Sequence, residues 1–161
     1  MSHEVLVAYS LFAGLAFCTQ VCAAEGKYDN QSCYAGPAHV IQHADGIVSG
    51  SFDLTGMTRG IEGSPFDRMS AHCVGSFANI SGEQDINGSC EYWNAAGDKY
   101  FGIFARKGDP AKAEGTWRFV HGTGKFAGIS GEGKWMSIGE FPPVPNVGSG
   151  CNHEWGTYST K

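Results

Sequence analysis

Residues 115–135, GTWRFVHGTGKFAGISGEGKW, constrain the fold of this chain more than any other segment. The segment opens with an aromatic and β-branched run at 115–121 and continues through glycines at 122, 124, 128, 131 and 133. Aromatic and β-branched residues favour strands. Glycine reaches positive φ at little steric cost, which lets a chain reverse sharply. The segment therefore predicts two antiparallel strands joined by a glycine-rich turn.

The rest of the chain repeats this arrangement of short strand-like runs separated by turn signals. Glycine is abundant, with 24 of 161 residues, and helical periodicity is nearly absent. Eight antiparallel strands close a barrel that has no exposed edge and leaves room for side chains or one small ligand. We therefore predict an all-β fold, an eight-stranded antiparallel β-barrel of the calycin-like type. The predicted strands are residues 33–43, 47–57, 68–78, 85–93, 99–106, 115–121, 131–141 and 151–160.

The turn sequence GTGKFAG at 122–128, with Gly131 and the strand that follows, resembles the "GTGxFxGxxG" hairpin of allene oxide cyclase and dirigent proteins. The resemblance implies an allene oxide cyclase-like or dirigent-like barrel of the secreted bacterial type. Within that group, the cyclases confine a reactive fatty-acid epoxide in the barrel, and dirigent proteins bind phenoxy radicals and guide their coupling. No catalytic residue of either family falls on a matching motif here, so the resemblance assigns none.

The N-terminal segment, residues 1–24, is predicted to be a cleaved signal peptide that precedes a single barrel domain at 25–161. Residues 5–17 are an uninterrupted apolar run too short for a comfortable membrane span. Ala23 and Ala24 supply the small residues that a signal peptidase needs. The absence of Lys and Arg before the run counts against this interpretation, and a buried N-terminal helix is the alternative. Export predicts a secreted or periplasmic protein without stable membrane insertion after cleavage.

Four cysteines remain after residue 24, and an even number in an exported chain predicts disulfides. Cys73 and Cys90 lie in successive predicted strands, which usually neighbour one another. Cys33 and Cys151 begin the first and last predicted strands, which are adjacent in a closed barrel. The starts of antiparallel neighbours lie at opposite ends, so the second pair needs an extension of one strand, or one of its cysteines pairs elsewhere.

Several chemistries are not expected. Residues 128–134 match G-x4-G-K by letter, but Trp135 stands where a phosphate-binding loop needs Ser or Thr. His39 and His43 would share a strand face at roughly 13 Å, too far apart to chelate one ion. The net charge of −5 does not suit a nucleic-acid partner. We therefore predict no nucleotide, no nucleic acid, no metal and no cofactor.

Strand alternation picks out a candidate ligand-binding wall in two neighbouring predicted strands. If their aromatic faces meet inside the barrel, Arg106 and His121 lie at the end of an aromatic wall. Arg106 would hold a carboxylate, and His121 would move a proton near neutral pH. The alternative is an ordinary aromatic core with the polar pair at a solvated rim. The candidate residues are Tyr100, Phe104, Arg106, Trp117, Phe119 and His121.

The opposite strand faces offer a second arrangement, in which Glu91 and Arg118 form an ion pair inside the barrel. Sequence alternation alone leaves open which face is inside.

Two functions follow from these observations. The first is a protein that binds a small, largely apolar molecule in the barrel. The alternative is an isomerase- or cyclase-type enzyme that confines a reactive substrate. An ionisable residue aimed into a closed pocket favours the enzyme, an apolar pocket favours the binding protein, and a filled interior favours a structural role. The sequence gives no indication of the oligomeric state.

Overall fold

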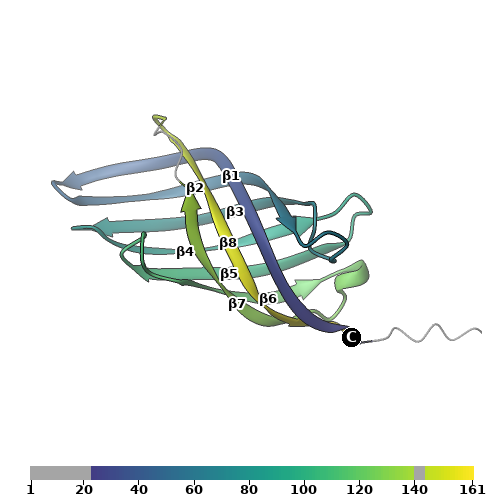
Figure 1. The fold of residues 1–161 in the computed structure, drawn as a ribbon. Coiled ribbons are helices and arrows are strands. Elements are labelled where there is room, and N and C mark those ends of the chain that lie inside the picture. The colour runs from purple at the N-terminus through teal and green to yellow at the C-terminus, as the bar shows by residue number, and fades with distance from the viewer. Residues whose placement is uncertain (1–22, 140–143) are drawn as a thin grey trace, which may run out of the picture.

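The computed structural model describes residues 23–139 and 144–161, so the predicted signal peptide lies almost entirely outside the described residues. Eight strands form one closed barrel, and each strand is antiparallel to both neighbours (Figure 1). The predicted all-β, eight-stranded antiparallel barrel is therefore confirmed. The strands are β1 (Glu25–Ala44), β2 (Ile47–Gly60), β3 (Met69–Ile80), β4 (Glu83–Trp93), β5 (Lys99–Gly108), β6 (Gly115–Gly122), β7 (Ser130–Gly139) and β8 (Val147–Ser159).

The first strand is longer than predicted. Residues 25–32, which precede the predicted first strand at 33–43, form the first part of β1 and pair with β8. Tyr28, Asn30 and Ser32 point inward and are buried, which is the period-two pattern of a strand. Most of these residues are polar, so the pattern is not visible as an alternation of apolar and polar residues in the sequence. β1 and β8 consequently run side by side over most of their length (Figure 1).

The glycine-rich segment forms the predicted hairpin of β6 and β7. The short 3₁₀ turn η1 (Gly124–Phe126) lies between the two strands. Gly124 and Gly128 adopt φ of 57° and 70°, the left-handed region that glycine occupies without strain. The turn therefore owes its course to glycine, as the sequence indicates.

Inward-facing glycines also make room for large rings from neighbouring strands. A Cβ atom at Gly102 would overlap the indole of Trp117, and one at Gly115 would overlap the indole of Trp135. Each indole therefore packs directly against a glycine of the adjacent strand, which explains part of the high glycine content.

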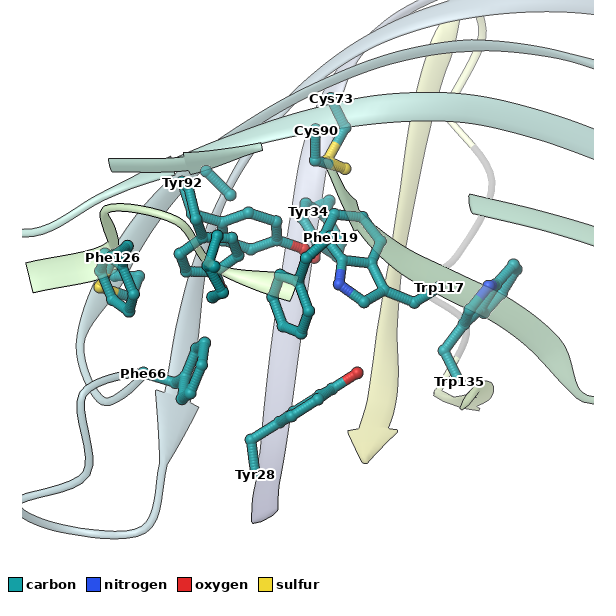
Figure 2. Packing of buried hydrophobic residues seen from close by; sticks show 14 residues of the cluster. Tyr28, Tyr34, Phe66, Cys73, Cys90, Tyr92, Trp117, Phe119, Phe126 and Trp135 are labelled. Atoms are coloured by element: carbon teal, nitrogen blue, oxygen red, sulfur yellow. A yellow bond between two sulfur atoms is a disulfide. The ribbon is translucent and has the colours of Figure 1, made fainter. Parts of the chain in front are cut away.

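An aromatic cluster fills one end of the barrel. Phe66, from the loop between β2 and β3, is 1% exposed and lies at its centre. Its ring centroid is 4.7–5.8 Å from those of Tyr28, Tyr100, Phe119, Phe126 and Tyr158. Figure 2 shows Phe66 and Phe126 at one side of the buried cluster and Trp135 at the other.

Both expected cysteine pairs are present. Cys33 and Cys151 are directly opposed on β1 and β8, on the outer face of the seam that closes the barrel. Cys33 lies inside β1 because this strand starts at Glu25, so the expected mismatch of strand starts does not arise. Cys73 and Cys90 are opposed on β3 and β4 with buried side chains that face the interior (Figure 2).

Within residues 23–139 and 144–161, no helix has the length and apolar character needed to cross a membrane.

Candidate ligand-binding cavity in the barrel

The barrel interior contains a cavity of about 500 Å³ in the half away from Phe66. Its rim includes Asn79, Gln84 and Pro110, which lie at the end where short turns join β1 to β2 and β3 to β4. The Phe66 cluster closes the opposite end. The cavity is therefore a cup with one filled end and one rim.

The wall of the cup is apolar and rich in rings. Phe104 stands between two other rings, 6.3 Å from Phe52 and 6.1 Å from Trp135 between centroids. The Cys73–Cys90 disulfide also lines the wall. The remaining apolar wall is formed by Leu54, Ile86, Trp117 and Val147.

A carboxyl group lies deeper in the cup. Glu154 of β8 lines the cavity, and its Oε1 accepts a 2.9 Å hydrogen bond from the Tyr34 hydroxyl. The Tyr34 hydroxyl is 2.7 Å from that of Tyr92, so the three side chains form one hydrogen-bonded chain. Tyr34 comes from β1 and Tyr92 from β4, so the chain links strands from different parts of the barrel wall.

Burial raises the pKa of Glu154 to about 7, because the barrel interior removes water from the charged form. Hydrogen bonds from Tyr34 and Ser32, and the nearby His153, act in the opposite direction and are outweighed. Burial also raises the pKa of Tyr34 and Tyr92, so both hydroxyls stay protonated. Glu154 is therefore a group that both gains and loses its proton near neutral pH.

Arg106 of β5 stands at the rim and is 6% exposed. Its Cζ lies 4.5 Å from the centre of the Trp135 ring. Nη1 donates to Ser137 Oγ at 3.0 Å and to the Pro110 carbonyl at 3.4 Å, and Nη2 donates to Gln84 Oε1. Burial lowers the pKa of Arg106.

The structure separates the six residues of the predicted wall. Phe104, Arg106 and Trp117 line the cavity. Tyr100 and Phe119 instead pack against Phe66 in the filled end. Some of the predicted residues therefore belong to an aromatic core and others to the cavity wall.

His121 does not share the inward face, so the expected alternation is wrong at this residue. Phe101 pairs with His121 while Gly102 pairs with Phe119, which leaves Val120 as an extra residue in β6. Such a bulge shifts the side-chain alternation by one position. His121 is consequently exposed on the outer face.

The expected interior ion pair of Glu91 and Arg118 is also wrong. Both side chains point away from the barrel interior. Glu91 instead forms an ion pair with Lys99, with a distance of 2.8 Å between Oε1 and Nζ. Arg118 is exposed.

The other motif residues lie on the outer face as well. Lys134 pairs with Glu114, and His43 bonds Ser49 at 2.7 Å. His39 is exposed. Across the described residues, no three side chains of the metal-binding types gather into a candidate site.

The sequence analysis missed Glu154 because its candidate wall came from only two strands and did not include the last one. In β8, Asn152, Glu154, Gly156 and Tyr158 share one face. The opposite face carries the aromatic Trp155, so alternation alone does not mark either face of β8 as inward.

No family model, curated protein or solved structure matches this chain. The likeness to the allene oxide cyclase and dirigent hairpin thus remains a local resemblance of the turn sequence.

Proposed function

We propose that this protein binds a small, largely apolar molecule in the cup of its barrel. The observation that carries the proposal is the cavity of about 500 Å³ with an aromatic and aliphatic wall. Small-molecule sites are typically concave, mainly apolar and about 300–1,000 Å³ in volume, with a few placed polar groups.

The construction of the barrel supports this function. Its wall is a continuous hydrogen-bonded sheet, and two disulfides join neighbouring strands. A wall formed before the ligand arrives loses little conformational entropy on binding. The filled end also gives the ligand one route, through the rim.

Binding can be tested with the neutral fluorescent probe N-phenyl-1-naphthylamine. We expect saturable one-to-one binding to the wild-type protein, measured by the rise in probe fluorescence. Gly150 lines the cavity, and among the described residues a Cβ there meets only the Gly139 carbonyl oxygen, at 3.7 Å. The variant Gly150→Leu should therefore fold normally and bind at least about tenfold more weakly, because its side chain occupies the cup.

The matched control is Thr157→Leu, which places the same side chain on the outer face of β8. It should leave probe binding unchanged. Absence of saturable binding to folded wild-type protein would contradict the proposal, as would equal binding by the Gly150 variant.

A second candidate function is supported by Glu154. We propose, as the alternative, an isomerase- or cyclase-type enzyme in which this carboxyl moves a proton on a confined substrate. A general base works best when its pKa is near the working pH, and the pKa of Glu154 is about 7. Its hydrogen bond from Tyr34 fixes the position of the carboxyl.

Proton exchange on 1-tetralone, a compact ketone, tests this alternative. In deuterated buffer, the enzyme function predicts that the protein accelerates exchange at the carbon next to the carbonyl, followed by NMR. Glu154→Gln should abolish the acceleration. Equal exchange with wild-type protein, the variant and no protein would remove the support for proton-transfer chemistry by this residue.

We also propose that the protein acts outside the cytoplasm. Two disulfides are compatible with an oxidising compartment, and β1 begins at Glu25, next to the predicted cleavage site. Intact mass of the protein exported by its host should give an N-terminus at Ala24 or Glu25. Retention of Met1 would contradict cleavage.

A further inference from the structure

In the part of the chain that the structure describes, no carboxylate lies within ion-pair distance of the Arg106 guanidinium. The acidic residue whose field it senses, Asp109, bonds Lys112 at 2.9 Å instead. Within the described residues, Arg106 donates to three neutral oxygens, those of Gln84, Ser137 and Pro110.

A buried guanidinium with neutral partners alone is an unusual arrangement. Removing a charge from water is costly, and proteins normally pair such a charge. A guanidinium has five N–H donors, and within the described residues Nε is buried without an acceptor. Residues 23–139 and 144–161 therefore leave this guanidinium without a counterion and without an acceptor for Nε.

We infer that the ligand of the cup is a ring-bearing carboxylic acid whose carboxylate lies against Arg106 at the rim. This inference rests on the proposed binding function and adds the chemical class of the ligand. Carboxylate is the anion whose planar geometry suits the donors of arginine.

The surroundings of Arg106 determine where the rest of the ligand lies. The Trp135 ring lies beneath the guanidinium, and Phe104 packs edge-on against Trp135. An apolar ring bound below the rim meets these aromatic surfaces and Trp117.

Glu154 determines which end of the ligand lies at the rim and which lies deeper in the cup. This acidic side chain lies deeper in the cup, where its ionised form repels an anion. The same site favours an apolar or hydrogen-bond-donating end. An anionic head at Arg106 and an uncharged body toward Glu154 pair the guanidinium and avoid this repulsion.

The test compares two probes of nearly identical shape, 1-naphthoate and 1-naphthamide, by calorimetric titration. We expect naphthoate to bind wild-type protein about tenfold more tightly or better, as a charge-assisted hydrogen bond predicts. Arg106→Met should abolish this preference and leave naphthamide binding within about threefold.

Two further variants separate the roles of charge and fold. Gln84→Glu gives Arg106 a permanent carboxylate partner and should abolish the preference even if Arg106→Met fails to fold. Lys107→Gln removes the adjacent exposed positive charge on the outer face of β5 and should retain the preference.

Each outcome decides a different claim. Equal binding of the two probes to wild-type protein overturns the carboxylate inference and upholds the binding function. A preference that survives both Arg106→Met and Gln84→Glu overturns the assignment to Arg106. Failure of both probes and of N-phenyl-1-naphthylamine contradicts the binding function itself, and the inference falls with it.

Discussion

Phe66 is 1% exposed and has five aromatic rings around it at one end of the barrel, whereas Phe104 and Trp135 at the other end face a cavity of about 500 Å³. The same strands build both halves, and their inward residues are aromatic in both. The difference arises from the connections between the strands. At the filled end, the loop after β2 inserts Phe66 and the turn after β6 inserts Phe126.

Two of the connections at the rim are too short to do the same. Asp45 and Gly46 alone separate β1 from β2, and Ser81 and Gly82 alone separate β3 from β4. A two-residue turn has no side chain long enough to reach back into the barrel. The filled end is packed because Phe66 and Phe126 enter it from longer connections, whereas these two short turns supply no equivalent ring.

The two halves also differ in polarity. The described titratable side chains that line the cavity include Glu154 and Arg106, one near the base of the cup and one at the rim. The filled half contains tyrosines, and burial together with Glu154 raises the pKa of Tyr28 well above its usual value. The two ionisable groups Arg106 and Glu154 therefore lie in the half of the barrel that has space for a ligand.

The largest expected effect is a loss of stability when the packing of the filled end is disrupted. Phe66→Ala should lower the free energy of unfolding by about 3–5 kcal/mol, because a fully packed ring is lost. Phe104→Ala removes a ring that already faces the cavity and should cost about half as much or less. Urea unfolding of both variants measures the difference. Equal losses would show that the two ends are packed alike.

The next effect is the pH dependence that Glu154 confers on the hollow end. Its pKa of about 7 in the folded state exceeds the ordinary value of 4.5. The folded state therefore binds the proton more tightly, and the resulting stability is full below about pH 4.5 and is lost as the pH rises through 7.

Glu154→Gln has no proton to lose, so its stability relative to wild type should rise by on the order of 3 kcal/mol between pH 4.5 and 8. Urea unfolding across this pH range provides the measurement. Glu132→Gln, on the exposed outer face of β7, is the matched control. A constant difference between Glu154→Gln and wild type at all pH values would contradict the raised pKa.

The sequence was informative where structure follows from local pattern. Period-two alternation and glycine turns were sufficient to predict eight strands and their closure. Closure in turn placed Cys33 near Cys151, and the order of strands placed Cys73 near Cys90.

The side chains that fill or line the barrel interior could not be predicted from the local sequence pattern. Phe66 is a single aromatic residue within the loop between β2 and β3, and its insertion depends on contacts with distant strands. The bulge at Val120 moved His121 outward because one extra residue inverts the alternation. Glu154 could be placed inside only once the pairing of β8 with β1 and β7 was known.

The smallest expected effects come from adding one methyl group to a glycine in each half. At Gly133, a Cβ would overlap both the Tyr28 hydroxyl and the backbone oxygen of Trp155. Gly133→Ala should therefore reduce stability by about 1–3 kcal/mol, the usual range for overpacking. The cost is expected because a backbone atom cannot move aside as a flexible side chain can.

At Gly150, the same methyl group would extend into the cup. Gly150→Ala should change the free energy of unfolding by less than about 1 kcal/mol, with stabilisation favoured because alanine restricts the unfolded chain. Thermal and urea unfolding of the pair measure the contrast. A loss at Gly150 as large as that at Gly133 would mean that the cavity is closed to side chains, and the cup would then have no room for a ligand.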